Sequence, residues 1–136
     1  MTPEATTPSL PPTRPLLHTV LRVIAWLVPL GVVAQAVLAG QSTFAGADLI
    51  GLHGGLGHGV LLLSIITAGL AWVTRARSVV AVLATLAVIV LVAQTGLGYA
   101  GSRTGMNAAS ALHIPLGVLI VGITTVVATW LTADRR

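Results

Sequence analysis

The chain of 136 residues is long enough for one domain, and it is far more apolar than a water-soluble protein. Apolar residues make up 55% of the sequence and charged residues only 7%, with a mean hydropathy of +0.97. The absence of cysteine excludes disulfides, iron–sulfur clusters and thiolate metal sites. The net charge of +4 comes from arginines placed singly or in pairs, which does not indicate a nucleic-acid-binding protein.

The chain begins with a proline-rich segment, and four long apolar runs follow it. Residues 1–15 contain five prolines, so we expect a disordered tail. The apolar runs cover about 16–40, 49–73, 79–101 and 108–131. Each reaches the ~20 residues that a helix needs to cross ~30 Å of hydrocarbon. Because lipid cannot satisfy backbone polar groups, we predict an all-α domain of four transmembrane helices at 16–133.

Short connections between the runs predict the arrangement of the helices. Sequential helices joined by short loops are antiparallel neighbours, so the expected fold is an up-down-up-down four-helix bundle. The arginines predict its orientation, because cytoplasmic loops are enriched in positive charge. In this fold Arg103 is on one side of the membrane, and the other six arginines are on the opposite side: Arg14, Arg22, Arg75, Arg77, Arg135 and Arg136. We therefore expect a multi-pass plasma-membrane protein with both termini cytoplasmic and loops 41–48 and 102–107 outside.

The two halves of the sequence repeat. The second apolar run contains LHGGLGHGVLLL and the fourth contains LHIPLGVLIVGI, which share the pattern L-H-x-x-L-G. Upstream of this pattern, Gln35 precedes His53 by 18 residues and Gln94 precedes His113 by 19. The repeat predicts two helical hairpins of the same plan, placed side by side as in membrane proteins with parallel repeats.

The repeat places one polar residue of each helix at a similar depth. Counting ~1.5 Å per residue from the helix ends brings Gln35, His53, Gln94 and His113 into one layer. Polar groups inside a membrane usually face the bundle interior and are a functional-site hypothesis by default. One helical turn below the histidines lie two glycines, Gly57 and Gly117. We expect each histidine to overhang a groove without a side chain, as a flat macrocycle requires.

Two chemical interpretations of this layer remain open. Two histidines that face each other at equal depth are suited to bis-histidine ligation of haem iron, and bundle cores hold such cofactors. The same four residues could instead form hydrogen bonds across the bundle, with the glycines allowing close helix packing. The first interpretation gives a haem protein, and the second gives a cofactor-free structural or accessory subunit of a membrane complex.

Short motifs in the second hairpin resemble a known family. The stretch QTGLG from Gln94, followed by NAASALHIPLG from Asn107, resembles one four-helix half of haem A synthase. The resemblance to this half extends over residues of about 20–132. The chain also resembles small uncharacterised four-helix membrane proteins of high-GC bacteria. Each half of that enzyme has histidine pairs facing a haem near the outer side. The resemblance implies that His113 is one axial ligand and that a histidine of the second helix is the other.

The sequence departs from the family where the family's chemistry is concentrated. Haem A synthase carries a glutamate three residues before the histidine of its second helix, whereas Ile50 precedes His53 here and Gly55 precedes His58. The family's outer cysteine pair and its second bundle have no counterpart either. The resemblance therefore implies a scaffold that holds haem b for electron transfer, redox sensing or haem handling. We do not expect the chain to be an enzyme by itself.

His58 is an alternative ligand. It lies five residues after His53, which separates the two rings by about 140° around the helix. One helix cannot easily present both rings to one iron, and the repeat favours His53, so His58 is the alternative ligand or a proton-relay group. The predicted cofactor site thus comprises His53 and His113 as iron ligands with Gln35, Gln94, Gly57 and Gly117 around them.

The roles of two charged residues close to this layer have alternatives, and so does the identity of the partners. Asp48 is expected to cap the second helix or to contact the haem edge. Arg103 is expected to pair with a haem propionate or to be a solvated loop residue. The predicted partners are the lipid bilayer and either a membrane redox complex or a second copy of the chain.

Overall fold

The structure, a computed structural model, describes residues 13–104 and 107–133 and contains four helices there. Their bounds are α1 Thr13–Phe44, α2 Ile50–Val73, α3 Ser78–Thr104 and α4 Asn107–Ala133. All four are long and apolar enough to cross a membrane. The predicted all-α fold with four membrane-spanning helices is confirmed.

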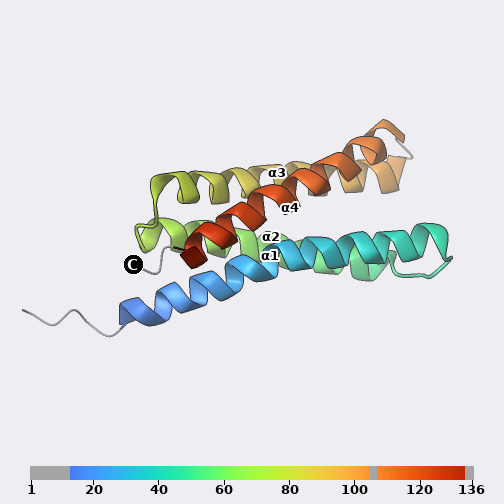
Figure 1. Cartoon of the computed structure of the whole chain (residues 1–136). Helices are drawn as coiled ribbons and strands as arrows, with labels where there is room; N and C mark the ends of the chain where they lie inside the picture. The colour runs from blue at the N-terminus through green and yellow to red at the C-terminus, as the bar shows by residue number, and fades with distance from the viewer. Residues whose placement is uncertain (1–12, 105–106, 134–136) are drawn as a thin grey trace, which may run out of the picture.

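The helices form an antiparallel bundle (Figure 1). Each helix packs against two others, in the cyclic order α1, α2, α3 and α4, and among the described residues the backbones of diagonal helices do not come close to one another. The connection 45–49, the end of α3 and the start of α4 lie at one end of the bundle, and we call the half on this side the histidine half. The connection 74–77, the start of α1 and the end of α4 lie at the other end, and we call the half on that side the terminal half.

The helices are longer than the apolar runs that predicted them. The expected loop 41–48 is helical up to Phe44, and the expected loop 102–107 is helical up to Thr104. An α-helix satisfies its own backbone groups in water as well as in lipid, so hydropathy marks the membrane rather than the end of the helix. At the start of the chain, residues 13–15 of the expected tail already belong to α1, and residues 1–12 lie outside the described residues.

The start of α2 differs from the prediction. The N-cap residue is Leu49, which has no capping side chain, so the predicted capping role of Asp48 is wrong. The backbone N–H of Leu49 donates to the Ser42 hydroxyl at 3.2 Å. The chain reverses just before this point at Gly46, whose φ of +67° is in the region that glycine tolerates best. The last turn of α1 therefore supplies the contact that fixes the start of α2.

The two hairpins are structurally equivalent. The distance in sequence from Gln35 to Gln94 is 59 residues, and that from His53 to His113 is 60. With the 60-residue offset, the classes of exposure are identical at all ten positions of 51–60 and 111–120. Residues that the sequence shows as repeated are therefore also repeated in space, as two hairpins around one axis.

A pair of hydrogen bonds in the terminal half follows the same symmetry. The indole of Trp26 donates to Thr132 between α1 and α4, and the indole of Trp72 donates to Thr85 between α2 and α3, each at 3.1 Å. The two offsets relate position 26 to 85 and position 72 to 132, so donor and acceptor are exchanged between the hairpins. Both seams between the hairpins are thereby joined in the same way at this level.

Small apolar side chains let the four helices approach closely in the terminal half. Its buried cluster is rich in alanine: Leu21, Ala25, Ala68, Val80, Ala84, Val127, Ala128 and Leu131. Small residues at the interface are how membrane helices gain packing contacts in the absence of a strong hydrophobic driving force. A second buried cluster lies between this region and the histidines: Val28, Val32, Val60, Leu91 and Ile120. The histidine layer is thus separated from the terminal end by apolar packing.

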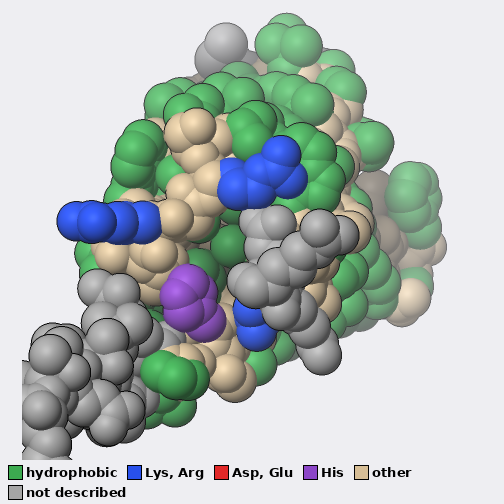
Figure 2. Space-filling model, turned by 60° about the vertical axis from the view of Figure 1, so that its left-hand side comes forward, with side chains coloured by type: hydrophobic (Ala, Val, Ile, Leu, Met, Phe, Trp, Pro, Cys, Tyr) green, Lys and Arg blue, Asp and Glu red, His purple; other side chains and the backbone are tan. Residues whose placement is uncertain are grey.

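Positive charge gathers at the terminal end of the bundle. The described arginines there are Arg22, Arg75 and Arg77, and Figure 2 shows arginine side chains together with a histidine on this face. Arg22 also donates from Nε to the carbonyl of Leu131 at 2.9 Å, which ties α1 to α4. This distribution is the one on which the predicted cytoplasmic location of the terminal end rests.

Candidate functional site

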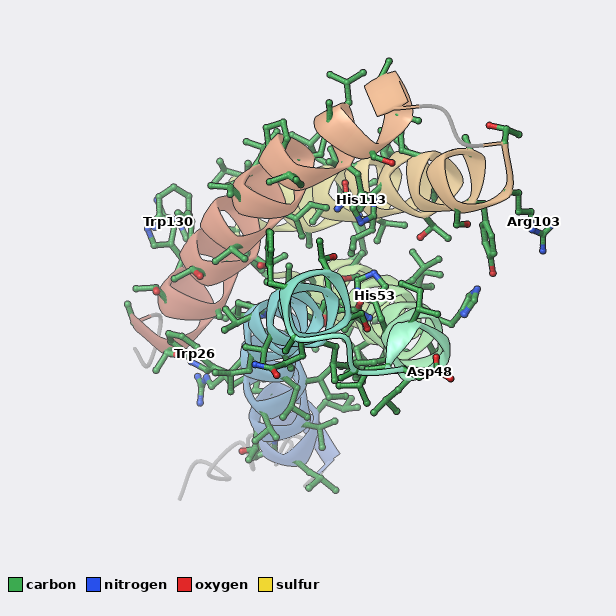
Figure 3. All side chains as sticks on the ribbon, turned by 90° about the vertical axis from the view of Figure 1, so that its right-hand side faces the viewer. Trp26, Asp48, His53, Arg103, His113 and Trp130 are labelled. Carbon is green, nitrogen blue, oxygen red and sulfur yellow. The ribbon has the colours of Figure 1, made fainter. Side chains whose placement is uncertain are left out.

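Two histidines face each other in the middle of the histidine half. His53 of α2 and His113 of α4 have ring centroids 6.2 Å apart and ring planes inclined at 58°. Figure 3 looks into the bundle from this end and shows the two side chains pointing toward one another. Both residues are half-buried. The pair that the repeat predicted is therefore brought together by the fold.

One ring nitrogen of each histidine, Nδ1, is hydrogen-bonded to the neighbouring helix of the same hairpin. Nδ1 of His53 lies 3.0 Å from the carbonyl oxygen of Gln35, and Nδ1 of His113 lies 3.0 Å from that of Gln94. A carbonyl can only accept, so Nδ1 carries the hydrogen in both rings, and Nε2 carries the free electron pair of a neutral imidazole. Neither Nε2 has a hydrogen-bond partner among the described residues.

The two glutamines lie at the level of the histidines, but their amides are bonded differently. The Gln35 amide donates from Nε2 to the carbonyl of His53 at 2.7 Å. Oε1 of Gln94 is buried and has no hydrogen-bond partner. A buried polar atom without a partner is costly, and of the two glutamines only Gln94 has a buried amide oxygen in this state.

The glycines below the histidines make room for these amides. A Cβ on Gly57 would lie 3.1 Å from Nε2 of Gln35, and a Cβ on Gly117 would lie 3.3 Å from Nε2 of Gln94. The expected grooves are therefore not empty, because a glutamine side chain of the same hairpin packs over each glycine. Only Gly57 of the two also lines the cavity described next.

One contact was missed by the sequence prediction. A Cβ on Gly98 would lie 3.2 Å from Cε1 of His113, so the absence of a side chain there leaves space for the imidazole. Gly98 follows Gln94 by four residues and shares its helix face, which is the signal that could have identified it. The repeat-related position carries Ala39, so the two rings do not have identical surroundings.

A cavity of about 480 Å³ opens around the two histidines between the four helices. Most ligand pockets have volumes of about 300–1,000 Å³. The histidines and both glutamines line the cavity, and the apolar residues Val32, Val60, Leu91 and Ile120 form its floor. The site is thus a largely apolar chamber with two imidazoles directed into it.

The cavity departs from the symmetry of the hairpins on one side only. Most of its lining consists of repeat-related pairs, but five lining residues have mates that do not line it, namely Gly57, His58, Thr95, Tyr99 and Gly101. All five belong to α2 or α3. The cavity therefore extends toward the seam between these two helices.

Three polar side chains stand at this seam. Nε2 of His58 lies 3.0 Å from the hydroxyl oxygen of Tyr99, and the guanidinium carbon of Arg103 lies 4.9 Å from the centre of the Tyr99 ring. All three residues are exposed. His58 is thus placed with Tyr99, whereas His53 is placed with His113. Asp48 is also exposed and lies on the α1–α2 connection (Figure 3).

Protein side chains alone offer a metal ion only two ligands here. Among residues 13–104 and 107–133, no group of three or more His, Cys, Asp or Glu side chains could hold an ion. A zinc site commonly has three or four protein ligands. A metal between His53 and His113 would therefore need its remaining ligands from another molecule.

Comparisons with protein-family models, with curated proteins and with solved structures found no match for this chain. The resemblance of the second hairpin to haem A synthase thus stays a prediction from short motifs. What bears on function is the site itself, with its two facing imidazoles and the cavity around them.

Proposed function

We propose that the protein binds one b-type haem in the membrane, with His53 and His113 as the axial ligands. The observation that carries this proposal is the pair of facing imidazoles, each with Nδ1 bonded and Nε2 free. A metal–imidazole bond of about 2 Å, with about 1 Å more to the ring centre, puts two rings on opposite sides of one ion about 6 Å apart. The centroid separation of 6.2 Å agrees with this value.

The residues around the histidines fit a haem better than a bare metal ion. Two protein nitrogens are enough for a six-coordinate haem iron, because the macrocycle supplies the other four ligands. The cavity volume of about 480 Å³ and its apolar floor suit a flat apolar molecule between helices. Covalent attachment through a C-x-x-C-H motif is excluded by the absence of cysteine, which leaves a non-covalent haem.

The protein's own contribution is to position and tune two ligands. The Gln35 and Gln94 carbonyls fix the tautomer and orientation of the rings and leave Nε2 of each histidine available to a metal. With both histidines engaged as ligands, haem would supply one-electron redox chemistry here. This favours electron transfer or redox sensing over the binding of a gas, and haem handling remains compatible with the same site.

The proposed setting is a plasma membrane, with both termini cytoplasmic and the histidine half toward the outside. The described arginines support this orientation, since Arg22, Arg75 and Arg77 belong to the terminal end and only Arg103 belongs to the other. Haem would then lie near the outer surface, within reach of a redox partner on that side or in the membrane.

Single substitutions test the ligands. The protein purified from haem-replete cells should show the absorption spectrum of six-coordinate low-spin haem. His53→Ala and His113→Ala should each lose that spectrum, because each removes one axial nitrogen. His58→Ala should keep it and is the matched control, because it removes a histidine of the same helix that contacts Tyr99 instead.

Two outcomes would overturn the assignment. Loss of the spectrum in His58→Ala but not in His53→Ala would make His58 the ligand of α2. If all four proteins lack haem and none binds it on titration, the polar layer is structural. The second candidate function would then apply, a cofactor-free accessory subunit, because each histidine is already hydrogen-bonded within its own hairpin.

A further inference from the structure

The seam between α2 and α3 differs chemically from the seam between α4 and α1, which the repeat makes its equivalent. On the first seam stand His58 and Tyr99, joined by a hydrogen bond. The positions related to them by the repeat are Val118 and Gly40, which cannot form such a bond. Symmetry is thus broken by polar residues on one side, and on that side the cavity reaches further outward.

We propose that the α2–α3 seam binds a carboxylate edge of the cofactor, with Arg103 and the Tyr99 hydroxyl as its partners. This inference rests on the proposed haem function and specifies which way the haem faces. The two propionate groups of haem b are its only charged substituents. A guanidinium and a hydroxyl are suitable donors to carboxylate oxygens.

The hydrogen-bond inventory at the seam allows this role. In the tautomer with hydrogen on Nε2, His58 donates to the Tyr99 oxygen, and the Tyr99 O–H is then free to donate to a carboxylate. The directions of the two side chains also favour this hydrogen bond. Because α2 and α3 are antiparallel and each side chain leans toward the start of its own helix, the side chains of His58 and Tyr99 lean toward each other. The His58–Tyr99 pair thereby spans the seam beside the histidine layer.

Charge also favours this side. Arg103 is the only Lys or Arg of the histidine half among the described residues, and it lies over the Tyr99 ring on α3. The repeat-related positions on the opposite seam carry Gly40 and Val118, neither of which has a basic group.

The test compares haem with its dimethyl ester, in which both carboxylates are neutral. Affinity of the full chain in detergent would be measured by absorbance titration for the wild type, Arg103→Gln and Tyr99→Phe. We expect the wild type to bind haem about tenfold or more tightly than the ester, which is the size of a hydrogen bond to a charged group. Arg103→Gln should lose most of this preference, and Tyr99→Phe part of it.

A matched control removes an arginine at the other end of the bundle. Arg22→Gln also lowers the net charge by one, but Arg22 contacts Leu131, so its preference for haem over the ester should equal that of the wild type. Equal affinities for haem and ester in the wild type, or an unchanged preference in Arg103→Gln, would overturn the seam inference alone. A wild type that binds neither compound would instead overturn the proposed function.

A separate observation in the terminal half carries a second inference. A cavity of about 10 Å³ lies on the bundle axis, and four repeat-related pairs line it: Ala25 and Ala84, Val28 and Ala87, Ser64 and Thr124, Thr67 and Val127. The hydroxyl oxygen of Ser64 is buried and has no hydrogen-bond partner. Thr67 and Thr124 donate to carbonyls of their own helices, so their oxygens can still accept.

We infer that this cavity holds a single water molecule. Its volume matches the space of about 10–15 Å³ that one water needs, and a buried water typically makes about three hydrogen bonds. Ser64 would donate to the water, and the water would donate to Thr67 and Thr124, which satisfies all three hydroxyls. The water would link α2 to α4 across the bundle, at a level where no hydrogen bond joins the described residues of these two helices.

The sign of one stability change tests this inference. If Ser64 has no partner, Ser64→Ala should leave the midpoint of thermal unfolding unchanged or raise it. If Ser64 holds a linking water, the midpoint should fall, and a high-resolution structure should show a density peak between the three hydroxyls. An unchanged or higher midpoint, or a Ser64 hydroxyl bonded to its own helix without a peak, would overturn the inference.

Discussion

The two halves of the bundle are made from the same repeated hairpin, but one is hollow and the other is closed. The histidine half contains a cavity of about 480 Å³, whereas the terminal half contains one of about 10 Å³. In the terminal half, alanines let the helices approach until only the small cavity remains on the axis. In the histidine half, the histidine and glutamine side chains form hydrogen bonds within their own hairpin. The space between the two hairpins therefore stays open.

The difference teaches that contact within hairpins and contact between hairpins are separable. Histidine–glutamine bonds hold α1 to α2 and α3 to α4 in the histidine half, while Trp–Thr bonds hold the two hairpins together in the terminal half. A ligand between His53 and His113 would add a link between the hairpins in the hollow half, beside the hydrogen bond that joins His58 to Tyr99 there.

The largest expected effect concerns which half faces the cell exterior. The chain has no cysteine, so Ala45→Cys, Ser102→Cys and Ser78→Cys each introduce a unique label site. On intact cells, an impermeant thiol reagent should label the first two, which belong to the histidine half, and leave the third unlabelled. Strong labelling at position 78 with none at the other two would reverse the orientation of the halves.

A large effect is also expected from filling the space beside the glutamines. Gly57→Leu and Gly117→Leu each place atoms where the Gln35 and Gln94 amides lie, and overpacking of this kind costs about 1–3 kcal/mol. We expect both variants to insert in the membrane but to lose haem, measured as absorbance per protein.

The matched controls for these variants are glycines of the same helices in the terminal half. Gly69→Leu on α2 and Gly122→Leu on α4 meet no atom within 4 Å at the Cβ position, so haem content should stay at the wild-type level. Full haem content in Gly57→Leu and Gly117→Leu would show that the positions of the glutamine amides do not matter for binding.

Overpacking the closed half should lower stability without acting on the ligands directly. Ala84 is 3% exposed and lines the small axial cavity, so Ala84→Leu should cost about 1–3 kcal/mol. Val82→Leu, on the lipid-facing side of the same helix, should change little because its side chain is 54% exposed. Thermal unfolding in detergent measures both, and equal midpoints for the two variants would contradict the close packing assigned to this half.

The smallest effect distinguishes the two glutamines in the cofactor-free protein. Gln35→Met removes a hydrogen bond and should cost about 1 kcal/mol, whereas Gln94→Met removes a buried oxygen that has no partner and should be neutral or stabilising. Unfolding midpoints of the two variants provide the comparison. A larger loss in Gln94→Met than in Gln35→Met would show that Gln94 is bonded after all.

Much of the architecture followed from the sequence. Four apolar runs gave the spanning helices, because lipid leaves a long apolar segment few alternatives to a helix. The shared pattern around His53 and His113 also predicted that the two rings meet, since the similar spacings of 18 and 19 residues from Gln35 and Gln94 give similar depths. These inferences depend only on helical geometry and on hydropathy.

The details of contact could not be obtained in this way. Helix ends beyond the apolar runs, such as Phe44, depend on local backbone bonding rather than on hydropathy. The packing of the Gln35 amide over Gly57 depends on a rotamer and on how closely two helices approach. The pairing of His58 with Tyr99 links two hairpins whose relative rotation no sequence spacing specifies.

The central claim is that the hollow half holds one haem between two histidines. The most direct measurement is the visible spectrum of the purified wild-type protein, combined with the molar ratio of haem to chain. The proposal predicts low-spin bis-histidine absorption and one haem per chain. A protein from haem-replete cells that is colourless, and that binds no haem on titration, would contradict the proposal.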